Sequence, residues 1–140
     1  MKKMLFIVAA MATTLMACNK YNYNATNVFG EWDLVAINGN EIELAEGITT
    51  PFIGFNQQED RIYGNAGCNS FFGSMIIDST NVDALRFDQL GSTRMMCANM
   101  ELEDNFLMAL GRVSSIEYNA DELQLKDDAN NVILLFARRR

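Results

Sequence analysis

The sequence has no histidine among its 140 residues, and it has only one proline and one tryptophan. The absence of histidine excludes Ser-His-Asp and Cys-His catalysis and removes the commonest transition-metal ligand. We therefore expect no enzymatic activity, no metal and no cofactor. The single proline and the 49% share of hydrophobic residues indicate a packed globular domain and not a disordered chain.

Positive charge is also scarce, because 11 Lys and Arg residues stand against 18 Asp and Glu residues, for a net charge of −7. Nucleic acid is excluded as a partner, since phosphate binding depends on dense Lys and Arg. The exception is the run Arg138, Arg139 and Arg140 at the end of the chain. We interpret this run as a solvated tail, with contact to anionic lipid headgroups as the alternative.

No apolar run reaches the roughly 20 residues that a membrane-spanning helix needs. The first 18 residues begin with Lys2 and Lys3, continue with a short apolar stretch and end with Leu15-Met16-Ala17-Cys18. This order is typical of a secretory leader, and its ending resembles the lipobox of bacterial lipoproteins. We expect residues 1–17 to be a signal peptide, Cys18 to carry the lipid, and residues 18–27 to form a polar tether.

Loss of the leader removes two lysines and takes the net charge from −7 to −9. The residue after Cys18 is Asn19, not the aspartate that retains many lipoproteins on the inner membrane of Gram-negative bacteria. The predicted location is therefore the periplasmic face of the outer membrane, with the membrane contacted through the lipid on Cys18.

From residue 28 onward, short alternating runs separated by Gly, Asn and Asp predict antiparallel strands. The runs cover residues 30–37, 41–44, 52–55, 61–64, 71–77, 84–90, 92–96, 115–118, 123–125 and 132–136. Trp32 is predicted to be a core residue, Asn38-Gly39 a tight hairpin turn, and residues 132–136 a strand covered on both faces.

The period changes near residue 100, where apolar residues recur every three or four positions. This predicts an amphipathic helix over about residues 100–111, with Asn99 as its cap and Gly111 as its end. We expect Glu101, Glu103, Asp104 and Asn105 to lie mainly on its polar side. The fold class is mainly β: a small antiparallel barrel with one α-helix packed against it.

Two motifs stand out, Gly67-Cys68-Asn69-Ser70-Phe71-Phe72-Gly73 and Thr93-Arg94-Met95-Met96-Cys97. With Trp32, they resemble the META domain, also known as the heat-shock protein HslJ family. The resemblance covers nearly all of residues 28–140. It implies a lipocalin-like β-barrel, a common place in envelope lipoproteins and an association with heat and drug stress, but no established molecular activity.

The glycines of the first motif indicate a tight corner in the backbone, which is its structural interpretation. The functional alternative is that Gly67, Asn69, Thr93 and Arg94 form a polar patch that recognises a partner or ligand. Cys68 and Cys97 remain after lipidation of Cys18, and an even pair in an oxidising compartment favours a disulfide. Two small buried core thiols are the alternative.

The function that we expect is a non-catalytic envelope module that binds another envelope protein or stabilises the cell surface under stress, as a monomer. One variant of this hypothesis is inhibition of a lysozyme-type hydrolase, because an acidic surface suits a basic enzyme. The alternative from another class is a binder of small apolar ligands inside the barrel.

Overall fold

Period-two alternation of apolar and polar residues governs most of the domain. The computed structural model describes residues 28–140, so the predicted signal peptide (1–17), Cys18 and the tether (18–27) lie outside the described residues. Nine strands and one helix form within residues 28–140. They are β1 (Gly30–Ile37), β2 (Asn40–Glu41), β3 (Phe52–Asn56), β4 (Arg61–Asn65), β5 (Ser70–Ile77), β6 (Leu85–Ser92), α1 (Glu101–Leu110), β7 (Ser115–Tyr118), β8 (Glu122–Lys126) and β9 (Val132–Arg138).

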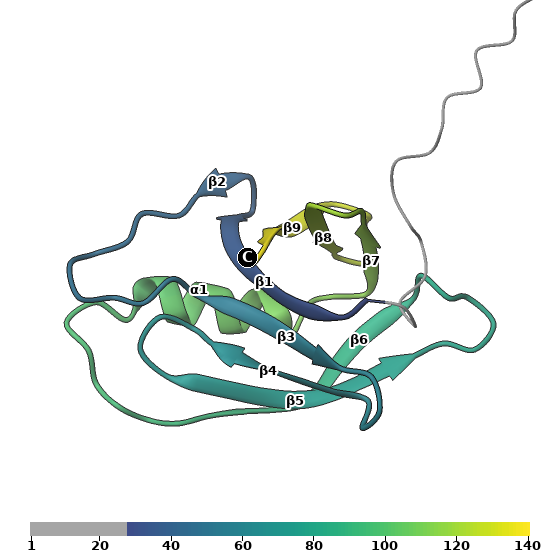
Figure 1. The fold of residues 1–140 in the computed structure, drawn as a ribbon, viewed down its shortest axis with the longest axis horizontal. Coiled ribbons are helices and arrows are strands. Elements are labelled where there is room, and N and C mark those ends of the chain that lie inside the picture. Colours follow the sequence, from purple (N-terminus) through teal and green to yellow (C-terminus); the bar gives the residue numbers. More distant parts are fainter. Residues whose placement is uncertain (1–27) are drawn as a thin grey trace, which may run out of the picture.

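The strands pair antiparallel in the order β6-β5-β4-β3-β1-β9-β8-β7, and the short β2 pairs with β1. Figure 1 shows the sheet curling strongly, so that its two halves face each other. The two ends of the order meet at a single bridge between Ala84 and Ser115, beside the start of β6 and β7. The predicted mainly β fold, a small lipocalin-like antiparallel barrel with one helix, is confirmed, and the barrel is partly open.

The hairpin from β1 to β2 follows the turn that its sequence predicts. Asn38 and Gly39 both have positive φ, 50° and 80°, as a type I′ turn requires. The second strand is shorter than predicted, because β2 ends at Glu41. Past its end, the N–H of Ile42 still donates to the carbonyl of Val35 at 3.0 Å. Trp32 in β1 is fully buried, as predicted.

The helix α1 crosses the inner side of the curled sheet (Figure 1). Its Phe106 is fully buried between Phe71 of β5 and Phe136 of β9, with ring centroids 5.5 Å and 6.0 Å away. Phe106 therefore joins the two halves of the sheet. Burial of a side chain of this size stabilises the fold by roughly 1.5–3 kcal/mol. Within residues 28–140, no helix is long and apolar enough to cross a membrane.

The ends of α1 differ slightly from the prediction. The residue at the N-cap is Met100, and Asn99 lies one position earlier, where its Oδ1 accepts the N–H of Glu101 at 3.0 Å. Gly111 closes the helix as predicted, but with a right-handed φ of −67°. The helix therefore begins with a side-chain contact from outside the cap position.

Two strand predictions need correction. Residues 92–96 do not form a strand of their own: β6 ends at Ser92, and residues 93–100 form a loop that leads to α1. The apolar strand β9 is not covered on both faces, because Val132 is exposed and Leu135 is only half-buried, whereas Ile133, Leu134 and Phe136 are buried. Its outward face thus borders solvent.

The interpretation of the terminal arginines as a solvated tail is wrong for two of them. The guanidinium of Arg138 lies 3.8 Å from the ring centroid of Trp32. Arg139 stacks on Phe52 at the same distance and donates to the carboxylates of Glu31 (3.1 Å) and Asp33 (2.7 Å). The β9 ladder with β1 places these side chains over the sheet, which a composition argument does not capture.

Candidate functional site

The first motif forms the corner between β4 and β5, and its glycine is required by the backbone. Gly67 has a φ of +119°, which residues with a side chain rarely adopt. The N–H of Gly67 donates to Oδ1 of Asn65 at 2.8 Å, and the N–H of Ala66 donates to the carbonyl of Asn69 at 2.8 Å. The turn is therefore closed by its own polar groups, as the structural interpretation predicts.

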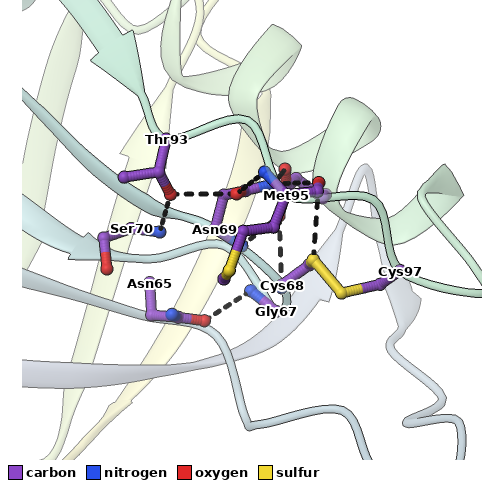
Figure 2. Close-up of a disulfide and its surroundings, with 9 residues drawn as sticks. Asn65, Gly67, Cys68, Asn69, Ser70, Thr93, Met95 and Cys97 are labelled. Carbon is purple, nitrogen blue, oxygen red and sulfur yellow. Dashed lines mark hydrogen bonds between the residues drawn. A yellow bond between two sulfur atoms is a disulfide. The ribbon is translucent and has the colours of Figure 1, made fainter.

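Asn69 is the centre of a hydrogen-bond network (Figure 2) and is 1% exposed. Its Nδ2 donates to Oε1 of Glu103 (2.6 Å) and to the carbonyl of Met95 (3.0 Å). Its Oδ1 accepts from the hydroxyl of Thr93 (2.9 Å) and the N–H of Met95 (2.7 Å). All four hydrogen-bonding positions of the amide are used, so Asn69 joins the corner, the loop of residues 93–100 and the helix.

Glu103 of α1 is the site residue that sequence reasoning placed wrongly. The prediction set it on the polar side of the helix, but Glu103 is 4% exposed. Its Oε2 accepts the backbone N–H groups of Cys68 (3.1 Å) and Asn69 (2.7 Å), which the tight corner leaves without strand partners. The signal was present: Glu103 lies three and seven residues before Phe106 and Leu110, on the face that α1 buries.

Cys68 and Cys97 are joined by a disulfide in the structure, with Cα atoms 6.1 Å apart and a sequence separation of 29. Cys68 is buried in the corner, and Cys97 lies in the loop of residues 93–100. Figure 2 shows the bond beside Asn69 and Met95. The loop is thus attached to the corner twice, by the disulfide and by the side chain of Asn69.

The predicted polar patch assembles only in part. Thr93 meets Asn69 through its hydroxyl, and its Oγ1 also accepts the N–H of Ser70 at 3.2 Å. Arg94 is exposed and makes no hydrogen bond or ion pair within residues 28–140, so it does not join the network. Gly67, Asn69 and Thr93 therefore build the corner, whereas the exposed Arg94 lies beside it without joining it.

The outer side of the corner is a groove of about 370 Å³ between the loop and α1. Met95, Met96, Met100 and Leu107 supply its apolar lining beside Arg94. Met95 is 59% exposed and Met96 is 88% exposed, so two adjacent apolar side chains of this tethered loop border solvent. We call residues 93–97 with this groove the methionine loop.

Asn69 and Glu103 have structural roles in this arrangement. The polar groups of Asn69 and Glu103 are consumed by each other and by backbone groups, so neither is free to move a proton of a substrate. Among residues 28–140, no group of three or more Cys, Asp or Glu side chains is placed to hold a metal ion. The methionine loop is the part of this arrangement that is exposed to solvent.

Comparison with known families and structures agrees with this fold. The family whose sequence model matches is the META domain, over residues 24–140. A structure of a protein from Burkholderia xenovorans, determined by NMR, is similar with a TM-score of 0.64 and 22% identity, over 96% of this chain and 100% of that chain.

Two further solved structures share the fold. A second protein with an NMR structure has a TM-score of 0.56 and 25% identity, over 76% of this chain and 86% of its own. A DUF4847 family protein from Bacteroides vulgatus has a TM-score of 0.55 and 13% identity, over 79% and 92%. No curated protein matches the chain.

Proposed function

The chain belongs to the META domain family, and on this premise we propose that it is a lipid-anchored, non-catalytic envelope lipoprotein whose domain serves as a stress-related protein-interaction or envelope-stabilising module. The lipid on Cys18 holds it at the periplasmic face of the outer membrane, and it acts there as a monomer. The leader and the lipobox resemblance support the anchor. The disulfide between Cys68 and Cys97 supports an oxidising compartment.

The observation that carries the interaction function is the combination of rigidity and exposure in the methionine loop. The loop is tied to the corner by the Cys68–Cys97 disulfide and by the bonds of Asn69 to Met95, yet Met96 is 88% exposed. A surface that is already ordered loses little conformational entropy on binding, and a methionine thioether adapts to varied apolar partners. The adjacent Arg94 adds a cation for a partner's carboxylate.

The alternative of an apolar ligand inside the barrel is not supported, because side chains fill the interior. Large fully buried residues from both halves of the sheet and from the helix meet there: Trp32, Phe71, Leu85, Phe106, Leu110, Ile116, Leu123, Leu134 and Phe136. Inhibition of a lysozyme-type hydrolase remains a specific form of the interaction hypothesis. The net charge, −9 after loss of the leader lysines, supports attraction to a basic enzyme.

The anchor and the interaction are tested separately. Cells that make the wild-type chain or Cys18→Ala are grown with labelled palmitate and fractionated. We expect label and outer-membrane location for the wild type and neither for Cys18→Ala. Label on Cys18→Ala would refute the assigned lipidation site, and an unlabelled wild-type chain would refute the anchor.

For the interaction, the wild-type lipoprotein is released gently from its own membranes and examined by native mass spectrometry beside Met96→Ala and Met108→Ala. Met108 is the matched control, since it is 66% exposed on α1 but does not line the groove. We expect a co-purifying envelope protein with the wild type and Met108→Ala, and its loss with Met96→Ala. Retention by Met96→Ala, or no partner at all, would contradict the interaction function of this loop. Unchanged lysozyme activity at low salt would exclude the inhibitor form.

A further inference from the structure

A second surface, on the outer face of the sheet, carries two exposed aromatic rings. The strand register aligns Glu31, Gly54, Tyr63, Phe72 and Gly91 as direct partners across β1, β3, β4, β5 and β6. Direct antiparallel partners project to the same face of a sheet. Tyr63 is 42% exposed and Phe72 is 48% exposed, so both rings of this central row border solvent.

Gly54 and Gly91 flank the two rings, and because they have no side chain, the rings can pack flat against the sheet backbone. A Cβ atom on Gly54 would lie 2.3, 2.6 and 2.7 Å from Cζ, Cε2 and Cε1 of Tyr63. Such similar distances place that point over the ring face and not at the ring edge. A Cβ on Gly91 would lie 2.8 Å from two ring atoms of Phe72. Each ring therefore covers the backbone of a glycine with one side and leaves the other side open.

The ring of Tyr63 is held in this position by polar and aromatic neighbours. Its hydroxyl donates to Oε1 of Glu31 at 3.2 Å. Burial and the nearby Glu31 carboxylate raise the pKa of Tyr63 above its ordinary value, so the hydroxyl stays protonated and keeps donating. Phe52 stands almost perpendicular to this ring, at 79°, and its own face is covered by Arg139. The open aromatic faces are thus those of Tyr63 and Phe72.

Two rows that are polar except for Phe52 border the central row. On one side, Asn56, Arg61, Ser74 and Asp88 are successive partners across four strands. On the other side, Asp33, Phe52, Asn65 and Ser70 are successive partners. Amide and hydroxyl groups therefore lie on both sides of the two rings, and the guanidinium of Arg61 lies on one side.

The charges of this face nearly cancel, unlike those of the whole chain. Arg139 binds both Glu31 and Asp33, and the flanking row contains Arg61 and Asp88. The chain as a whole has a net charge of −7. A cationic or anionic ligand finds no excess of opposite charge here, whereas an uncharged ligand with many hydroxyl groups finds donors and acceptors of both kinds.

We propose that this face binds a chain of uncharged pyranose sugars, with sugar rings stacked on Tyr63 and Phe72 and hydroxyl groups bonded to the flanking rows. The face of an aromatic ring is electron-rich, and the C–H bonds on the flat side of a pyranose carry partial positive charge, so the two surfaces attract. The proposal concerns a surface separate from the methionine loop and does not depend on the function assigned to that loop.

The test uses the full processed lipoprotein in a detergent without sugar headgroups, titrated in a calorimeter with chitohexaose and with cellohexaose. We expect saturable binding of at least one hexasaccharide. Tyr63→Leu and Phe72→Leu keep an apolar side chain but remove the ring face, and each should weaken binding by about fivefold to tenfold. Phe72→Trp restores a larger ring and should bind at least as tightly as the wild type, which separates loss of stacking from loss of folding.

Met96→Ala is the control for the two surfaces, and we expect it to bind the sugar like the wild type. The proposal is overturned if neither hexasaccharide binds at millimolar concentration, or if both leucine variants bind unchanged. It is also overturned if the wild type forms a dimer that Phe72→Leu dissociates in sedimentation equilibrium, because the occupant of the face is then a second copy of the chain. None of these results bears on partner capture through Met96.

Discussion

The Nδ2 atom of Asn69 lies 2.6 Å from Oε1 of Glu103, and this short hydrogen bond joins the β4–β5 corner to the first turn of α1 across 34 positions of sequence. The same carboxylate accepts two backbone N–H groups of the corner. Because the Cys68–Cys97 disulfide attaches the adjoining loop to the same corner, the methionine loop is held by a covalent and a polar clamp together. The order of this loop therefore depends on both clamps.

The first prediction concerns the polar clamp. Replacing Glu103 by alanine leaves the N–H groups of Cys68 and Asn69 and the Asn69 amide without their acceptor. An unsatisfied buried donor costs about 1–3 kcal/mol, so we expect Glu103→Ala to lower the free energy of unfolding by about 3 kcal/mol. Urea titration followed by the fluorescence of the buried Trp32 measures it.

Glu101→Ala is the matched control, because Glu101 lies on the same helical turn and is exposed. It should change the free energy of unfolding by no more than about 0.5 kcal/mol. Equal urea midpoints for the two variants would show that Glu103 does not hold the corner.

The second prediction concerns the covalent clamp. The bond between Cys68 and Cys97 closes a loop of 29 positions. The chain-entropy model gives a stabilisation of about 3–4 kcal/mol for a loop of this length. We expect the double variant Cys68→Ser, Cys97→Ser to lose this amount in urea titration, and the wild type with excess dithiothreitol to match it. A wild type whose urea midpoint is insensitive to dithiothreitol, at complete reduction shown by thiol counting, would contradict the prediction.

Much of the fold follows from the sequence because the burial pattern of each strand is visible in its own alternation of apolar and polar residues. In β1, β4 and β5, alternate residues face the core, so the period of two is visible without knowledge of the partner strands. The helix was predictable for the same reason, since its apolar residues recur with a helical period and pack inside the sheet. The Asn38-Gly39 turn was also predictable, because these two residues by themselves favour the positive φ angles that the turn requires.

The parts that sequence could not place depend on contacts between distant segments. Residues 93–96 are extended and partly apolar, but β5 begins at Ser70, so the N–H of Met95 bonds to the Asn69 side chain and not to a strand. Arg138 and Arg139 have the composition of a solvated tail, but the register of β9 with β1 places them over Trp32 and Phe52. Such pairings are set by the fold and have no local signature.

The third prediction is a pair of opposite pH effects. Burial, with the nearby Glu117 carboxylate, raises the pKa of Asp83, so its charged form weakens the folded state above the ordinary aspartate value of about 3.9. Asp83→Asn should therefore be more stable than the wild type at pH 7, with the difference shrinking toward pH 4. Hydrogen bonds from Thr80 lower the pKa of Asp78, so Asp78→Asn should be less stable at pH 7, and that difference should vanish as the pH falls below 4.

Urea midpoints of the three proteins between pH 3 and pH 7 test this pair. Asp78→Asn and Asp83→Asn both replace a carboxyl group by an amide in the loop between β5 and β6, so each variant is the control for the other. Shifts of the same sign at pH 7 would contradict the assignment of burial to one carboxyl and of hydrogen bonding to the other.

The fourth prediction separates the terminal arginines. Arg139 makes two partly buried ion pairs, to Glu31 and Asp33, and stacks on Phe52. Arg140, in contrast, has a side chain that is 90% exposed, and its ion pair with Asp121 is long, with 4.0 Å between the guanidinium and the carboxylate. An exposed ion pair contributes about 0–1 kcal/mol and an exposed cation–π contact about 0.5–1 kcal/mol. We expect Arg139→Ala to lower the free energy of unfolding by about 1 kcal/mol and Arg140→Ala to leave it unchanged. The urea midpoints of both variants measure this, at low salt and again at 1 M salt, where screening of the ion pairs reduces the loss in Arg139→Ala. If the two variants are equally stable at low salt, the terminus behaves as the solvated tail that its composition suggests.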